Sequence, residues 1–329
     1  MGTLLRSFAL ALGLAVVLGV LAGVSATRAA NDEIVFTSPS GESSYHDVGA
    51  GFTLAWEEGI GADSRELVEQ QASLDVDGGC SNVDWQPTDT TTPDGTSLTV
   101  SLQPDRCYRW KVKVTADSES FSATSGAVRT LKAWANKMNL YRKGVFSTQL
   151  RWDWCVAAST QIMFNIIRNQ NDHSRSGQKA YYQYARANDL TPDHIPGADP
   201  RGWAATLSNY GGGSYTDVSS PTFKSALRAA AKRMRLTGKP VGILARAGDH
   251  AMVLNGFKAT ADPAKTNDFT VTRVWVMGPL YPTKPSYDPP PNTRLDADTF
   301  KRKYFRRYSD PFGSAAWSVW EGYFVTINP

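Results

Sequence analysis

Three residue types in this chain could together attack a carbonyl group: a cysteine, a histidine and a glutamine. Cys155 lies in the segment TQLRWDWCVAASTQIMFN, residues 148–165, where helical periodicity begins. The N-terminus of a helix favours the thiolate, which is the nucleophilic form of cysteine. The residues that follow, Ala157, Ala158 and Ser159, are small enough to let a substrate backbone approach. The sequence therefore predicts a nucleophilic thiol at Cys155.

A nucleophilic thiol needs a base beside it, and the chain has 4 histidines. His250 is the best candidate, because it opens an apolar strand in AGDHAMVLNGF and has small neighbours. His46 belongs to a β-rich N-terminal region, while His173 and His194 lie in polar, turn-like segments. The alternative for His250 is a buried structural histidine. The order of cysteine before histidine favours the base.

Attack on a carbonyl also creates an oxyanion, which needs hydrogen-bond donors. Gln149 precedes Cys155 in the loop before the predicted helix. Its side-chain amide can donate to the oxyanion together with the backbone N–H of Cys155. Trp152 and Trp154 flank the thiol, and the sequence leaves two roles open for them. They either line a substrate cleft or wedge the loop against the core.

These residues resemble the pattern of papain-like cysteine peptidases over roughly residues 135–328. Gln149, Cys155 in a W-C-x-x-A-S context and His250 in H-A-x-V-x-x-G match three of the four family positions. The closest branch is the bacterial double-glycine (bacteriocin-leader) peptidase, which removes leader peptides from exported peptides. The resemblance implies an α+β fold and hydrolysis of peptide bonds by a Cys–His pair with a glutamine oxyanion donor.

The fourth family position departs from the pattern. The family has Asp-Pro at the end of the following strand, and here Gly278 precedes Pro279. Glycine cannot orient an imidazole, although a Cys–His pair can act without the orienting group. Asp249, Asn255 and Asp268 are the candidate substitutes. Asp249 is the least suited of them, because neighbours on a strand point to opposite faces.

Two alternatives to a peptidase stay open at this point. One is a peptidoglycan amidase or endopeptidase that uses the same cysteine and histidine, and the other is a catalytically weak cell-surface binding module. No cofactor is expected. No metal site is expected either, because C-x-x-C and H-E-x-x-H spacings are missing and the histidines are scattered. Without Arg6 and Arg28, the formal net charge falls from +4 to +2 (33 less 31), which is too small to imply a polyanionic partner. The expected partner is a peptide or protein substrate, and no nucleic acid is expected.

The region from about Ile34 to Leu131 consists of short alternating segments separated by Gly, Pro, Asp and Ser, which predicts an antiparallel β-sandwich. One of the expected strands is ASLDVDG, residues 72–78. In RCYRWKVKV, every second residue from Tyr108 to Val114 faces one side. The region resembles a fibronectin type III domain. The resemblance depends on Trp56 and on the tyrosine-corner spacing of LQPDRCYRWKVKVTA, with Leu102, Pro104 and Tyr108.

The first thirty residues read as a secretory signal peptide. One arginine precedes an uncharged run from Phe8 to Val24, and small residues follow. A signal anchor is the alternative, because the run approaches the length of a membrane span. The expected organisation is a signal peptide at 1–30, a sandwich at 31–132 and a peptidase domain at 133–329. The protein is expected to be secreted, and the sandwich to hold it at the cell surface or on a cell-wall polymer.

Export to an oxidising compartment predicts a disulfide between Cys80 and Cys107, which leaves Cys155 as the free thiol. Closing that loop should stabilise the fold by ~3–4 kcal/mol in the chain-entropy model. The alternation of the strand places Cys107 on its outward face, so the bridge is expected to run along the surface.

The C-terminal region is expected to begin with helices and to continue as an antiparallel meander. Helical periodicity covers residues 155–169, 176–189 and 220–235, the last with Ser220 as N-cap. The proline-rich segment PLYPTKPSYDPPPN, residues 279–292, reads as a loop at the rim of the site. TFKRKYFRRYSD, residues 299–310, reads as a helix with aromatic residues packed inward and a solvated cationic face. Contact of this cationic face with an anionic cell-wall polymer is the alternative.

Overall fold

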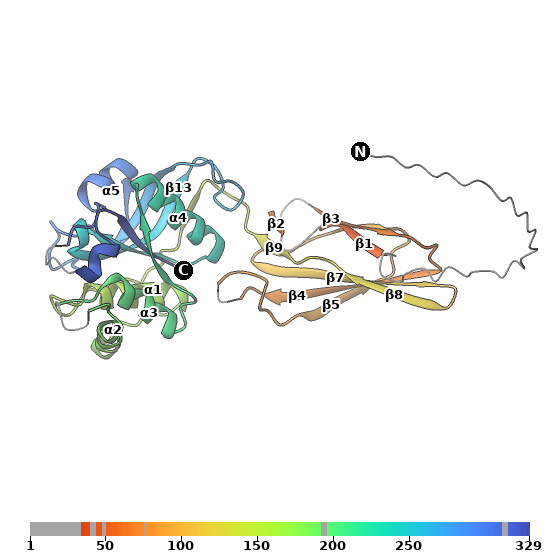
Figure 1. The fold of residues 1–329 in the computed structure, drawn as a ribbon, viewed down its shortest axis with the longest axis horizontal. Coiled ribbons are helices and arrows are strands. Elements are labelled where there is room, and N and C mark those ends of the chain that lie inside the picture. Colours follow the sequence, from red (N-terminus) through yellow and green to blue (C-terminus); the bar gives the residue numbers. More distant parts are fainter. Residues whose placement is uncertain (1–33, 40–43, 48–50, 76, 192–195, 311–314) are drawn as a thin grey trace, which may run out of the picture.

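The computed structural model describes residues 34–39, 44–47, 51–75, 77–191, 196–310 and 315–329. The expected signal peptide and His194 lie outside these residues. The described chain is β-rich and mixed, with three sheets and five α-helices. Figure 1 shows the strands of the N-terminal region at one end of the molecule and all the helices at the other. Among the described residues, no helix combines the length and apolar composition that crossing a membrane requires.

The N-terminal region contains nine strands: β1 (Ile34–Ser38), β2 (Ser44–Asp47), β3 (Phe52–Glu58), β4 (Ser64–Ser73), β5 (Gln86–Thr91), β6 (Ser97–Val100), β7 (Arg106–Ala116), β8 (Glu119–Thr124) and β9 (Val128–Leu131) among the described residues. One sheet has the order β1-β3-β6. The other has the order β2-β9-β7-β4-β5, with β8 also paired to β7. Neighbouring strands are antiparallel except β2 and β9, which are parallel.

The two sheets pack face to face over one hydrophobic core. Leu54 and Trp56 enter it from β3, and Tyr108 and Trp110 enter it from β7. The side of β7 that the alternation predicted to be buried is indeed buried. The hydroxyl of Tyr108 accepts a hydrogen bond from the backbone N–H of Gln103 at 2.9 Å, which is the contact that a tyrosine corner makes.

The disulfide between Cys80 and Cys107 is present, as predicted. The expectation that it runs along the surface is wrong, because both cysteines are buried. The loop after β4 folds back over the outward face of β7, so that Leu74, Val83 and Trp85 pack against the bridge. This loop supplies a second small core that strand alternation alone cannot reveal.

The C-terminal region is built on one seven-stranded sheet with the order β11-β16-β12-β13-β14-β15, with β10 paired to β13. The bounds of its strands are β10 (Lys137–Asn139), β11 (Thr216–Ser220), β12 (Val241–Ala245), β13 (His250–Ala259), β14 (Val271–Met277), β15 (Thr293–Asp296) and β16 (Phe324–Asn328). The helices are α1 (Cys155–Ile167), α2 (Arg175–Ala187), α3 (Pro200–Asn209), α4 (Phe223–Thr237) and α5 (Ala297–Lys303). Two short 3-10 helices, η1 (Arg246–Gly248) and η2 (Ala315–Val319), complete it.

Helices cover both faces of this sheet (Figure 1). On β13, Ala251 and Val253 join the core formed with α1, α2 and α3. The alternating residues Met252 and Leu254 join the core formed with α4 and α5. A strand that is buried on both faces must be apolar at every position, which explains the continuous run AMVL. The first residue of this buried strand is His250.

The structure corrects several expected boundaries. Ser220 is not the N-cap of α4, because it ends β11; Thr222 caps the helix and forms a capping box with Ser225. Helix α5 ends at Lys303, so Tyr308 lies beyond it, although its side chain is buried like that of Phe300. Helix α3 and strands β5 and β8 were not predicted. The strand expected at residues 72–78 is instead β4, which ends at Ser73.

Candidate active site

Cys155 is the first residue of α1, where the helix points its unpaired N–H groups toward solvent. It is half-buried and is the free cysteine of the chain. Its side chain lines a cleft of about 800 Å³. Ala157 and Ala158 are fully buried, so they pack the first turn of α1 inward instead of leaving space for a substrate. The helix itself is anchored to the sheet, because Oγ of Ser159 donates to the carbonyl of Ala251 at 3.2 Å.

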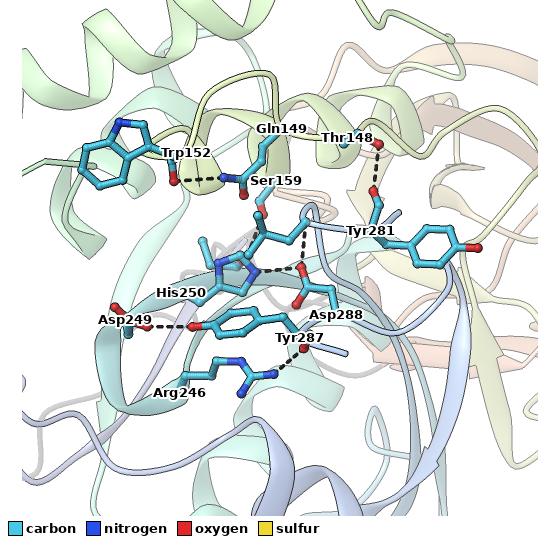
Figure 2. A network of polar contacts seen from close by, with 12 residues as sticks. Thr148, Gln149, Trp152, Ser159, Arg246, Asp249, His250, Tyr281, Tyr287 and Asp288 are labelled. Carbon is cyan, nitrogen blue, oxygen red and sulfur yellow. Dashed lines mark hydrogen bonds and ion pairs between the residues drawn. The ribbon is translucent and has the colours of Figure 1, made fainter. Parts of the chain in front are cut away.

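His250 lies beside the thiol at the start of β13 and is only 3 % exposed. Its ring forms a hydrogen bond with Asp288, and it lies close enough to the Cys155 thiol for that group to raise the pKa of the ring. Nε2 of His250 is 2.9 Å from Oδ2 of Asp288, which leaves Nδ1 as the nitrogen that faces the sulfur. Figure 2 shows the imidazole directed at the carboxylate. The structure therefore brings Cys155 and His250 together in the lining of one cleft, with Asp288 hydrogen-bonded to the far side of the imidazole.

Asp288 is the residue that the sequence did not identify. It lies in the proline-rich loop between β14 and β15, and its side chain is 0 % exposed. The backbone N–H of Leu280 donates to the same Oδ2 at 2.7 Å, and the N–H of Asp288 donates to the carbonyl of Lys284 at 3.0 Å. These bonds fold the loop so that its carboxylate points at His250.

The three substitutes proposed from the sequence do not touch the imidazole through their side chains. Oδ2 of Asp249 accepts from the hydroxyl of Tyr287 at 2.6 Å. The amide of Asn255 donates to Asn139 and Asn292. Asp268 is fully exposed near Arg228 on another part of the surface. The orienting group thus comes from the loop that was expected only to form the rim of the site.

Gly278 follows the last residue of β14 and lies against the carboxylate of Asp288. A β-carbon added at Gly278 would be 2.2 Å from Cγ of Asp288, far closer than two carbon atoms can approach. Position 278 and the carboxylate of Asp288 therefore compete for one space. Gly278 stands where the family has its orienting carboxylate. Because glycine has no side chain, it leaves the space that the carboxylate of Asp288 occupies.

The electrostatics of His250 follow from these contacts. Burial lowers the pKa of its imidazole, but the hydrogen bonds and charges of Asp288 and Cys155 outweigh burial and raise the pKa from 6.5 to about 9. The buried ring therefore carries a proton at neutral pH. An imidazolium beside a thiol is the arrangement that stabilises a thiolate.

Gln149 lies in the wall of the cleft and is largely buried. Its backbone N–H donates to the carbonyl of Pro279 at 2.8 Å, which joins this loop to the loop of Asp288. Its side-chain Nε2 donates to the carbonyl oxygen of Arg151 at 2.9 Å and to that of Trp152 at 3.0 Å. Figure 2 shows the second of these bonds. For this amide to donate to an oxyanion, one of its two hydrogen bonds to the loop carbonyls must break or become shared with the oxyanion.

The two tryptophans that flank the thiol take different roles. The indole of Trp152 is 74 % exposed at the rim of the cleft, where a substrate can cover it. Trp154 is 4 % exposed and stacks on Tyr182 with ring centroids 5.6 Å apart. Each of the two roles left open by the sequence thus applies to one of them: Trp152 lines the cleft, and Trp154 wedges the loop against the core.

Tyr287 ties the loop of Asp288 to the turn that precedes His250. Its hydroxyl donates to Asp249, and its ring packs edge-on against the imidazole with centroids 5.4 Å apart. The guanidinium of Arg246 lies 3.6 Å above the same ring and donates to the carbonyl of Tyr287. Arg246 begins η1 and Asp249 follows it, directly before His250, while Tyr287 directly precedes Asp288. We call these contacts of Tyr287 with Arg246 and Asp249 the clamp. Because the contacting residues adjoin His250 and Asp288 in the chain, the clamp helps to position both of these side chains.

Replacing Tyr287 by phenylalanine is expected to lower kcat/KM about fivefold, because the hydrogen bond to Asp249 that holds the loop contributes about 1 kcal/mol. Tyr281→Phe is the matched control, since Tyr281 lies in the same loop and the hydroxyl has no described hydrogen bond. The measurement is kcat/KM and the rate of thiol alkylation for both variants. Equal effects in the two would show that the clamp does not act on the site.

No group of three or more histidine, cysteine, aspartate or glutamate side chains that could hold a metal ion occurs among the described residues. No family model matches this chain, and no curated protein matches it. Among solved structures, the crystal structure of an engineered protein is similar over 30 % of this chain and 19 % of that chain, with 19 % identity and a TM-score of 0.21. A likeness of this size carries no argument about fold or function.

Proposed function

We propose that this protein is a cysteine peptidase in which Cys155 is the nucleophile and His250 the general base and acid. The observation that carries the proposal is that Cys155 and His250 line the same cleft, with the imidazole hydrogen-bonded to the buried carboxylate of Asp288. A thiol, an imidazole and an orienting carboxylate in contact at a cleft are the parts that nucleophilic acyl transfer needs. The cleft of about 800 Å³ can hold several residues of a peptide.

In the proposed reaction, His250 already holds the thiol proton as an imidazolium, and the thiolate sulfur of Cys155 attacks the carbonyl carbon of the substrate. The backbone N–H of Cys155, which has no intrahelical acceptor at this position, and the amide of Gln149 stabilise the oxyanion. The imidazolium then gives its proton to the leaving amine as the C–N bond breaks. Water, deprotonated by His250, attacks the thioester and releases the second product and the free thiol.

The finer fold assignments belong to the same proposal. The tyrosine-corner bond between Tyr108 and Gln103 favours a fibronectin type III-like sandwich. A cysteine-bearing helix packed on a sheet that presents the histidine favours a papain-like second domain. Export is also part of the proposal, and the disulfide fits an oxidising compartment.

Of the two other activities considered, the binding module loses its main support. It was motivated by Gly278, and the buried Asp288 now occupies the place of the orienting group. A peptidoglycan amidase or endopeptidase would use the same three residues, and no described contact favours it over a peptidase. Digestion of a peptide library and of muropeptides, each read by mass spectrometry, distinguishes the two substrates.

The direct test is alkylation of the native protein by iodoacetamide, together with peptidase activity. Cys80 and Cys107 are joined, so we expect one adduct in the wild-type protein and none in Cys155→Ala. The alanine variant should also lose at least about 10⁴-fold in kcat/KM while keeping its thermal stability. His250→Ala, which keeps the thiol, should react much more slowly than wild type at pH 7. Undiminished labelling of Cys155→Ala would end the proposal.

A further inference from the structure

The positive charge of this chain is concentrated in one short segment. Residues 298–307 contain five basic side chains and one carboxylate, Asp298. Arg6 and Arg28 lie in the first thirty residues. Without these two and the segment, 28 basic residues (35 less seven) face 30 acidic ones (31 less one). The rest of the chain is therefore slightly acidic, and the segment is not part of a generally basic surface.

This segment includes part of α5 and lines a groove of about 660 Å³. Its basic lining residues are Lys301, Arg302, Arg306 and Arg307, and all four are exposed. In the described part of the chain, none of them forms an ion pair with a carboxylate; the side-chain bond of Arg302, for example, is to the hydroxyl of Thr299. Asp298 also lines the groove, so four positive charges face one negative charge there, and the excess positive charge favours an anionic ligand.

Two of these side chains are held in place by their surroundings. The amine of Lys301 lies 5.7 Å above the ring of Phe223, and the guanidinium of Arg307 lies 5.4 Å above the ring of Phe324. Arg307 also donates to the carbonyl of Gly322. Holding a long side chain in advance reduces the entropy that binding must remove. The groove is thus better prepared for an anion than a freely moving surface lysine would be.

We propose that this groove binds a linear polymer of phosphate groups that carries no bases. Arginine is the residue that best matches phosphate, because its planar fork can donate two parallel hydrogen bonds. Proteins that bind single-stranded nucleic acid also present aromatic faces on which bases stack. The aromatic residues that line this groove, Phe305 and Phe324, are buried beneath it. The charges therefore fit a phosphate chain, and neither of the rings described in the groove lining is exposed for a base.

The groove lies next to the catalytic cleft along the chain. Ala247 and Arg307 line the groove, while their neighbours Gly248 and Tyr308 line the cleft. A phosphate polymer in the groove would therefore hold the enzyme with its cleft close to whatever peptide or protein is attached to that polymer. Binding itself does not depend on the peptidase activity, so the two proposals can fail separately.

The probe is inorganic polyphosphate of defined length, and the readout is its affinity for the full-length protein as a function of salt. The groove variant combines Lys301→Gln, Arg302→Gln, Arg306→Gln and Arg307→Gln. We expect it to bind about tenfold or more weakly at low salt, and the slope of log K against log salt to fall by about 3, because roughly one counterion is released per phosphate contact. The matched control removes the same charge elsewhere through Lys111→Gln, Lys113→Gln, Lys137→Gln and Lys258→Gln, all exposed. It should keep most of the affinity and slope.

The second variant combines Arg302→Gln and Arg306→Gln. Neither side chain forms a described hydrogen bond to the backbone, so this double variant should fold like the wild-type protein. It should reduce the salt slope by about 1 to 2. An unchanged slope in both groove variants, or an equal loss in the control, would overturn the proposal. Tighter binding of oligo(dT) or of polyglutamate than of polyphosphate with the same charge would also overturn it, because the partner would then be a nucleic acid or an acidic protein.

Discussion

Replacing Asp288 by alanine is expected to lower kcat/KM about 10³-fold, although Cys155 and His250 remain in place. The carboxylate is the contact that fixes the ring orientation and stabilises its charge. Without it, the imidazole can rotate within its pocket, and Nδ1 is no longer held toward the sulfur. The remaining activity would come from the thiol and the oxyanion donors alone.

The same variant should change the pH profile in a defined direction. In the wild-type protein the pKa of His250 is about 9, so the imidazolium and its interaction with the thiol persist up to that pH and are lost above it. Removing Asp288 leaves burial, which lowers the pKa of the ring, opposed only by Cys155. The alkaline limb of the kcat/KM profile should therefore move from near pH 9 to lower pH, by about 1 unit or more.

Asp288→Asn should be milder than Asp288→Ala. Oδ2 accepts from both Leu280 and His250, and an amide oxygen can still accept both bonds. Its NH₂ group would then occupy the place of Oδ1, which has no described hydrogen-bond partner. We expect a loss of about 10- to 100-fold. Asp268→Ala is the control for charge, since Asp268 is exposed and remote from the ring. An alkaline limb that stays near pH 9 in both Asp288 variants would contradict the assignment of Asp288 as the orienting group.

Much of the site could be predicted because its first two residues carry local signals. Cys155 begins a helix, and His250 begins a strand whose next four residues, AMVL, are all apolar. Asp288 carries no such signal. It lies in a loop without periodicity, 38 residues from its partner, and it is placed by backbone bonds that form only when the loop folds. The sequence offered one indirect indication of Asp288. Gly278 stands where the family has its orienting carboxylate, and the next segment is a loop that was already expected at the rim of the site.

The fold was predictable where one face of an element is buried. Strand β7 alternates clearly and was recognised, and so were α1, α2 and the meander from β12 to β14. Strand β4 was misplaced because SRELVEQQAS is mostly polar, and its pairing with both β5 and β7 cannot be read from composition. Helix α3 did have a signal that was overlooked, namely Asp199 as N-cap followed by Pro200 at the first position.

Gly278→Ala is expected to lower kcat/KM about 100-fold or more, because the new methyl group and the carboxylate of Asp288 cannot occupy the same space. The carboxylate must move, and both its bond to Leu280 and its bond to His250 then break. Overpacking of this kind should also reduce the free energy of unfolding by about 1–3 kcal/mol. Thermal unfolding and kcat/KM measured on the same samples separate the two effects.

Gly256→Ala is the matched control for crowding. A β-carbon there would lie 2.7 Å from the carbonyl oxygen of Met138, away from the cleft. We expect this variant to lose stability but to keep kcat/KM at temperatures where it is folded. If it lost as much activity as Gly278→Ala, the effect at position 278 would be general destabilisation.

Combining the substitutions tests whether position 278 acts through Asp288. In Asp288→Ala the carboxylate is gone, so adding Gly278→Ala should cost almost nothing further, and the two effects should be strongly non-additive. Gly278→Asp in the Asp288→Ala background goes one step further, because it places a carboxylate at the end of β14, in the space that Asp288 vacates. Partial recovery of activity, with the alkaline limb moving back toward pH 9, is the expected result. Additive losses in the first pair would mean that glycine is required at 278 for a reason unrelated to the carboxylate of Asp288.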